Sequence, residues 1–140
     1  MDYKTIAGAP NNMHNTPCCF AIYMAGLNLA HMIKMGGLPY YTDLAAKRSS
    51  TLYNYIDNSD GYYSNPVAVA DRSRMNLVFR VKCEPKLEEK FLAEALLEGL
   101  IELKGHRSVG GCRASCYNAM PLEGVETLVE FMKKFKTANP

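Results

Sequence analysis

The chain has 140 residues, which is the size of one ordinary domain and too short to hold a large two-domain cofactor enzyme in full. Hydrophobic residues make up 48% and charged residues 21%, a globular rather than a disordered composition. The formal net charge of +2 argues against a dedicated nucleic-acid binder, whose affinity rests on clustered basic residues.

The N-terminal half is predicted to be a loop followed by two helices. Residues 1–14 are rich in Gly, Pro and Asn and are expected to form a loop. Thr16 is expected to cap a helix that starts at Pro17, since proline suits the first helical position, and apolar residues then recur at helical spacing. A second helix is predicted over residues 38–56, after a Gly-Gly pair that ends the first.

The C-terminal half is predicted to alternate strands with helices. Residues 73–81 place Leu77, Phe79 and Val81 on one face, which is typical of a strand with one buried and one solvated side. The remaining predicted elements are strands at residues 62–63, 101–103 and 113–118 and helices at residues 86–97 and from Pro121 onward. This order predicts an α/β chain with a small α+β domain, in which helices cover one face of an antiparallel-rich sheet.

The densest group of polar functional side chains lies in residues 104–113. His106, Arg107 and Arg113 surround a glycine-rich run. Glycine lets the backbone approach a ligand, arginine offers a fork that matches carboxylate or phosphate, and imidazole adds a donor. The pattern predicts a binding loop for an acid with two anionic groups, and the alternative is a β connection with solvent-exposed charges. Because Arg113 starts an otherwise apolar strand, we expect it to be partly buried and paired.

Two further features have a functional and a structural interpretation. Asn15 and Thr16 precede a predicted helix, whose free N–H groups and positive dipole end can hold a phosphate, although ordinary capping explains the same residues. The four basic residues between Arg72 and Lys82 are interpreted as a solvated strand face rather than a nucleic-acid patch.

The sequence lacks the motifs of metal sites and of common catalytic sites, and its cysteines indicate a reducing compartment. No nucleophile elbow, Walker loop, HExxH, dinucleotide fingerprint, EF-hand loop or CxxC pair occurs in the sequence. The five cysteines are expected to be free thiols of a cytoplasmic or organelle-matrix protein. We expect no secretory signal and no membrane span, because the most apolar stretch is shorter than the roughly 20 residues that a span requires.

An ordered set of longer motifs resembles the phosphoserine aminotransferases. The matching runs are residues 15–23, 55–59, 72–76, 103–111, 113–115 and 117–125, followed by a closing helix. One departure is Cys18, where a second proline is usual in the family. The resemblance covers nearly the whole chain.

The resemblance implies a homodimeric, pyridoxal-phosphate-dependent aminotransferase of class V, with fold type I. Such enzymes exchange an amino group between glutamate and 3-phosphohydroxypyruvate in serine biosynthesis. By this similarity Asn15 and Thr16 would hold the cofactor phosphate of the neighbouring subunit, and Arg113 would bind the substrate α-carboxylate. His106 and Arg107 would help to bind the distal phosphate or side-chain carboxylate.

The resemblance also implies that the chain corresponds to the C-terminal portion of such an enzyme. Residues 1–14 would be a loop left from the large domain, residues 15–60 two linking helices, and residues 61–140 the small α+β domain. The family's cofactor lysine lies upstream of these motifs, so no catalytic residue is expected here and the isolated chain should be inactive. The alternatives are a stand-alone non-catalytic protein that binds phosphorylated acids or modulates assembly, and a small regulatory domain whose likeness is a coincidence of fold.

Overall fold

The computed structural model describes residues 2–140, which fall into two units, residues 2–38 and Pro39–Pro140. All the buried side chains of the described residues belong to the second unit, from Tyr41 onward. The second unit therefore contains the hydrophobic core. The second unit starts at Pro39, well before residue 61, where the predicted small domain starts, because the helix over residues 37–57 contributes buried residues to that core.

The first unit contains α1 (Tyr3–Ala7), the short 3-10 helix η1 (Pro10–Asn12) and α2 (Cys19–Lys34). The expectation of a loop over residues 1–14 is wrong for α1, because Asp2 caps this helix by accepting a hydrogen bond from the Lys4 amide at 3.0 Å. The prediction of a helix in residues 17–35 is confirmed by α2, although no residue of α2 is buried.

Most of α3 (Gly37–Asp57) belongs to the second unit, and this helix confirms the second predicted helix. Its buried apolar residues Ala45, Leu52 and Ile56 follow helical spacing, so one side of α3 faces the core. The Ser59 hydroxyl then stabilises the turn after the helix by accepting a hydrogen bond from the Tyr63 amide at 2.9 Å. This turn leads the chain directly into the sheet.

The sheet has three antiparallel strands in the order β1 (Tyr63–Ser64), β2 (Asn76–Val81) and β3 (Cys112–Ser115). The 3-10 helix η2 (Val69–Asp71) lies in the connection between β1 and β2. Burial alternates along β2, as the sequence pattern predicts, because one face is covered and the other is open.

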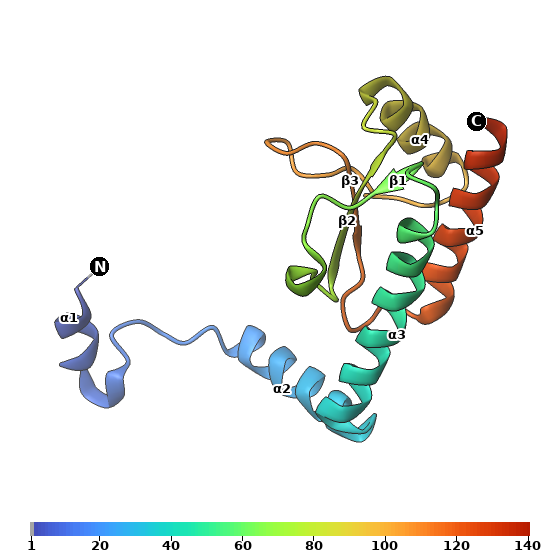
Figure 1. The fold of residues 1–140 in the computed structure, drawn as a ribbon. Coiled ribbons are helices and arrows are strands. Elements are labelled where there is room, and N and C mark those ends of the chain that lie inside the picture. Colours follow the sequence, from blue (N-terminus) through green and yellow to red (C-terminus); the bar gives the residue numbers. More distant parts are fainter. Residues whose placement is uncertain (1) are drawn as a thin grey trace. The chain divides into compact units, whose positions relative to one another are not determined.

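Two further helices, α4 (Pro85–Leu97) and α5 (Leu122–Ala138), complete the unit. Figure 1 shows α3, α4 and α5 on the same side of the sheet. The core forms where their apolar sides meet the covered face of the sheet, and its fully buried members include Leu52, Ile56, Leu77, Phe79, Val81, Phe91, Val125 and Met132. The predicted fold class, a small α+β unit with helices on one face of an antiparallel sheet, is confirmed.

The predicted strand at residues 101–103 is wrong. Glu102 has a φ of 58°, a left-handed conformation that cannot continue an extended strand. Pairing is restricted to one isolated bridge between Lys104 and Cys112. The segment that precedes β3 is therefore an irregular connection held to the sheet at one point.

Candidate functional site

The candidate binding loop is a projecting connection between α4 and β3. Its two sides are joined by a hydrogen bond from the Gly105 amide to the Gly111 carbonyl at 2.9 Å. Beyond this pair the chain turns back, because the Gly110 amide donates to the His106 carbonyl at 2.8 Å. Figure 1 shows this loop, drawn in orange, extending past the strands. We call residues 105–111 the anion loop below.

Two glycines of the anion loop are required by close packing. A side chain on Gly105 would overlap the carbonyl oxygen of Gly110 on the opposite side of the loop. Gly111 has a φ of 70°, and a Cβ atom there would lie 2.9 Å from the Phe79 carbonyl oxygen. The glycine-rich composition thus fixes the narrow shape of the loop and its contact with β2.

His106 and Arg107 lie in this loop and are exposed. The Nδ1 atom of His106 accepts a hydrogen bond from the Ser108 amide at 3.3 Å and lies 2.7 Å from the Ser108 hydroxyl. Because Nδ1 acts as an acceptor, the neutral imidazole carries its proton on Nε2. The loop therefore offers a ring N–H and a guanidinium, both of which are donors suited to an anion.

The same two residues line an open pocket of about 600 Å³ between the anion loop and α4. Three carboxylates, those of Glu88, Glu89 and Glu102, line this pocket together with Lys104, Arg107 and His106. The lining is therefore mixed in charge rather than uniformly positive. An anion would bind at the basic loop residues and away from the acidic wall formed by α4.

Arg113 occupies a different position. It lies on β3 opposite Val78 of β2, on the face of the sheet that the helices leave open, and it does not line the pocket. Arg113 is half-buried, as predicted, but the prediction that it is paired is wrong, because its buried Nε atom has no hydrogen-bond partner among the described residues. The apolar Val78 directly across the ladder offers no acceptor.

Asn15 and Thr16 belong to the first unit and are exposed. The expectation that Thr16 caps the helix is wrong, because α2 starts at Cys19 and its N-cap residue is Cys18. No side chain caps α2, so the amides of its first turn lack a side-chain acceptor. This arrangement leaves the start of α2 able to receive an anion.

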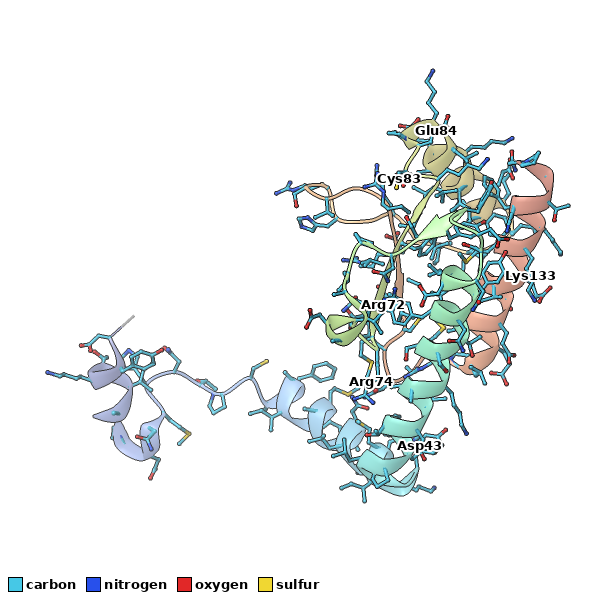
Figure 2. All side chains as sticks on the ribbon, in the orientation of Figure 1. Asp43, Arg72, Arg74, Cys83, Glu84 and Lys133 are labelled. Atoms are coloured by element: carbon cyan, nitrogen blue, oxygen red, sulfur yellow. The ribbon has the colours of Figure 1, made fainter. Side chains whose placement is uncertain are left out.

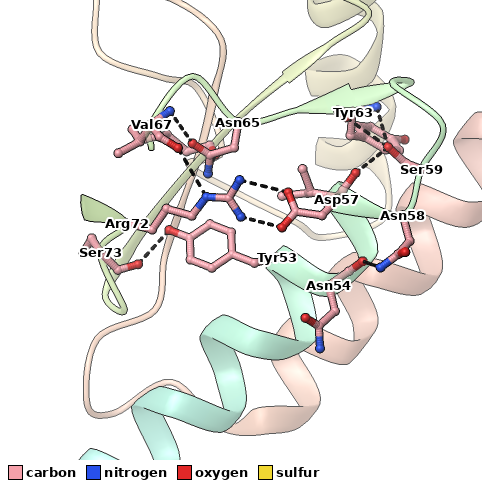
Figure 3. Close-up of polar contacts among 12 residues, drawn as sticks. Tyr53, Asn54, Asp57, Asn58, Ser59, Tyr63, Asn65, Val67, Arg72 and Ser73 are labelled. Carbon is pink, nitrogen blue, oxygen red and sulfur yellow. Dashed lines mark hydrogen bonds and ion pairs between the residues drawn. The ribbon is translucent and has the colours of Figure 1, made fainter. Parts of the chain in front are cut away.

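Arg72 is one of the four basic residues expected on a solvated strand face, but it lies before β2 and its side chain is only 12% exposed. Arg72 forms a two-pronged ion pair with Asp57 of α3, at 2.6 and 2.9 Å, and the guanidinium lies over the Tyr53 ring (Figure 3). The hydrogen bond with Asp57 raises the pKa of Arg72 further above its ordinary value. Arg72 thus connects α3 to the segment before β2.

The cysteine next to the anion loop is not a candidate nucleophile. All five cysteines have free thiols, and Cys112 at the start of β3 is buried. Burial raises the pKa of the Cys112 thiol to about 12, so it stays protonated near neutral pH.

Sequence reasoning missed Arg80, Glu88 and Arg48. Arg80 of β2 forms an ion pair with the buried Glu88 of α4, with Nε and Oε1 2.6 Å apart. Glu88 lies on the same buried side of α4 as Phe91 and Ala95. An acidic residue at an otherwise apolar helical spacing is unusual, and this pattern could have identified Glu88 from the sequence. Nothing comparable marks Arg48, which is fully buried in α3.

No metal site and no membrane-spanning helix occur within residues 2–140. No group of three or more His, Cys, Asp or Glu side chains is arranged to hold a metal ion there. No helix in this part of the chain is both long and apolar enough to cross a bilayer.

Comparison with known families identifies extensive similarity. The profile of the family described as Aminotransferase class-V matches residues 1–128. A phosphoserine aminotransferase of Laribacter hongkongensis is 52% identical over 134 residues, which are 96% of this chain and 37% of the relative. The chloroplastic phosphoserine aminotransferase 2 of Arabidopsis thaliana is 47% identical over 99% of this chain and 32% of its own length.

Solved structures agree with these sequences. The phosphoserine aminotransferase of Bacillus circulans subsp. alkalophilus superposes with a TM-score of 0.90 at 43% identity, over 99% of this chain and 38% of that protein. The PLP-bound phosphoserine aminotransferase of Trichomonas vaginalis gives a TM-score of 0.82 at 38% identity, over 94% of this chain and 37% of that protein. The chain thus spans about a third of the length of the relatives that it matches.

Proposed function

Since this chain belongs to the class-V aminotransferase family, we propose that it forms the C-terminal portion of a phosphoserine aminotransferase. The complete enzyme would exchange an amino group between glutamate and 3-phosphohydroxypyruvate, yielding O-phosphoserine and 2-oxoglutarate in serine biosynthesis. The similarity to phosphoserine aminotransferases over 96% or more of this chain supports this assignment.

We assign the substrate contacts to the three basic residues found near the glycines. Arg113 binds the α-carboxylate of the substrate, and His106 and Arg107 bind its distal phosphate or carboxylate. The observation that carries this assignment is the half-buried Arg113, which has no carboxylate partner among residues 2–140 and whose Nε atom makes no hydrogen bond there. A partly desolvated guanidinium without an acid is poised to bind an anionic ligand.

Pyridoxal phosphate is the cofactor that this family membership implies. The exposed Asn15 and Thr16, just before a helix start that no side chain caps, fit a phosphate group, and they would hold the cofactor phosphate of the neighbouring subunit in a homodimer. When bound, pyridoxal phosphate supplies an electron sink for the amino-group exchange. The side chains described here bind and orient ligands rather than exchange protons.

The isolated 140 residues are proposed to be inactive, because the family's cofactor lysine lies outside the matched motifs. We further propose a cytoplasmic or organelle-matrix location, with small-molecule substrates and no nucleic-acid or membrane partner. The net charge of +2 and the thiols of all five cysteines support this assignment.

The experiment that tests the substrate assignment compares Arg113→Ala with Arg74→Ala. Binding of O-phospho-L-serine to the chain is measured by calorimetry, and Arg113→Ala should weaken it about 10-fold or more, since a charge-assisted hydrogen bond is lost. Arg74, an exposed arginine just before β2, is the matched control (Figure 2), and its replacement should leave the affinity nearly unchanged. Equal affinities in the two variants would remove Arg113 from the site.

A second measurement tests the proposed inactivity. The chain is incubated with pyridoxal phosphate, glutamate and 3-phosphohydroxypyruvate, and then treated with borohydride. We expect no O-phosphoserine and no adduct at a specific lysine. Turnover together with such an adduct would overturn the proposal.

A further inference from the structure

The anion loop has little internal support. Its two sides are joined by the hydrogen bond between Gly105 and Gly111, and its tip is closed by amides that donate to the His106 carbonyl. His106 and Arg107 are exposed, so burial of their own side chains contributes little to fixing the loop. A loop of this kind needs contacts with the body of the protein to keep one conformation.

Arg80 of β2 provides such contacts. The backbone of Gly111 lies against the Arg80 side chain so closely that a Cβ atom on Gly111 would be 2.7 Å from Arg80 Cδ. At the end of the side chain, Arg80 Nη1 donates a hydrogen bond to the Val109 carbonyl at 3.4 Å. One side chain therefore touches the anion loop near its base and at its turn.

Glu88 fixes Arg80 from the opposite side. The Oε1 atom of Glu88 accepts from Arg80 Nε at 2.6 Å and from the Val81 amide at 3.3 Å. Glu88 is only 6% exposed. Its carboxylate is held in place because the residue belongs to α4 and the carboxylate accepts a hydrogen bond from the backbone of β2. The hydrogen bond to Glu88 also raises the pKa of Arg80, which keeps the guanidinium charged.

We propose that Arg80 is a positioning residue, which Glu88 anchors and which supports the anion loop in the conformation that presents His106 and Arg107. The loop then has a defined shape before any ligand arrives. This inference rests on the proposed function only for the identity of the ligand, because the support itself is a property of the folded chain.

Hydrogen exchange of the 140-residue chain tests the support without a ligand. In Arg80→Met, the Gly105 and Gly110 amides should exchange about tenfold or more faster relative to core amides of α5, because the loop opens locally. The control is Arg72→Met, which also removes an ion-paired arginine but one that contacts α3 rather than the loop. The proposal would be overturned if the exchange rates of the two loop amides rose equally in both variants. It would also be overturned if they rose only as much as those of the α5 amides.

A double variant separates support by Arg80 from the effect of an unpaired carboxylate. Adding Glu88→Gln to Arg80→Met removes the charge that Arg80 leaves behind, but it does not restore contact with the loop. We expect exchange of Gly105 and Gly110 to remain fast. A return to the original rates would mean that the unpaired carboxylate of Glu88 opened the loop, and the positioning role would be wrong.

Kinetics of a complete aminotransferase carrying this segment connect the loop to the ligand. Arg80→Met should raise the KM for O-phosphoserine about 3-fold to 10-fold while kcat changes less than about twofold, since substrate positioning is lost but the reacting groups remain. Faster loop exchange with an unchanged KM would leave the support by Arg80 standing. It would instead count against the proposed anion-binding role of His106 and Arg107.

Discussion

At the scale of single residues, Arg48 is a buried cation that forms no ion pair with a carboxylate of residues 2–140. Its side chain is 0% exposed, and its Nη1 donates to the Tyr117 and Met120 carbonyls in the turn between β3 and α5. Its Nε and Nη2 atoms have no partner among the described residues. Burying a charge costs free energy, which hydrogen bonds to the two carbonyls offset in part. Through these bonds Arg48 connects α3 to the turn that follows the strand of Arg113.

Replacing Arg48 should therefore destabilise the protein. Arg48→Ala leaves two carbonyls without their donor and opens a cavity, so the free energy of unfolding should fall by about 3 kcal/mol. Urea denaturation measures this change. The neighbouring Lys47 is exposed, and Lys47→Ala should change the same quantity by less than about 0.5 kcal/mol. Similar losses in the two variants would contradict a structural role for Arg48.

At the scale of elements, α4 joins the sheet to α5 through one aromatic side chain. The Phe91 ring centroid lies 5.7 Å from that of Phe79 in β2 and 5.1 Å from those of Phe131 and Phe135 in α5. Edge-to-face rings at these distances attract each other beyond the gain from burial. The same helix carries Glu88, so its position determines both the core and the anchor of the anion loop.

Truncating Phe91 should weaken the whole second unit. Phe91→Ala removes a fully buried ring that contacts β2 and α5, and the free energy of unfolding should fall by about 3–5 kcal/mol. Leu97 lies on the same helix but is 86% exposed, so Leu97→Ala should cost less than about 0.5 kcal/mol. Chemical denaturation followed by circular dichroism compares the two. A loss below about 1 kcal/mol for Phe91→Ala would contradict this account of the core.

At the scale of the whole molecule, the two units differ in how they are stabilised. The second unit has an apolar core, whereas α2 in the first unit has no buried residue. Several large apolar side chains of this helix are more than half exposed, namely Phe20, Ile22, Tyr23, Leu29 and Ile33. An isolated helix of this length gains little stability in water without packing.

The second unit should therefore fold without the first. A variant that starts at Gly37 should have a free energy of unfolding within about 1 kcal/mol of that of the full chain, because none of residues 2–36 is buried. Deleting residues 132–140 instead removes Met132 and Phe135 from the core and should abolish cooperative unfolding. Thermal and urea denaturation distinguish these outcomes. A loss of several kcal/mol on removing the first unit would show that its residues stabilise the second.

Local sequence patterns were sufficient for most elements of the fold. The helices α3, α4 and α5 and the strand β2 are predictable because their apolar residues recur at helical spacing or alternate along the strand. The strand predicted at residues 101–103 failed because its apolar composition does not reveal the left-handed φ of Glu102. Similarly, Thr16 has the chemistry of a cap, but the helix starts three residues later.

The sequence by itself determined the fold class, the family and the loop residues His106 and Arg107, because composition and ordered motifs are local properties of the chain. Only the tertiary structure decided that Arg113 lies on the open face of the sheet opposite Val78, and that Arg80 contacts the anion loop and is anchored by Glu88. These contacts depend on strand register and on helix packing. Register and packing bring together residues that are distant in sequence, so no local pattern encodes them.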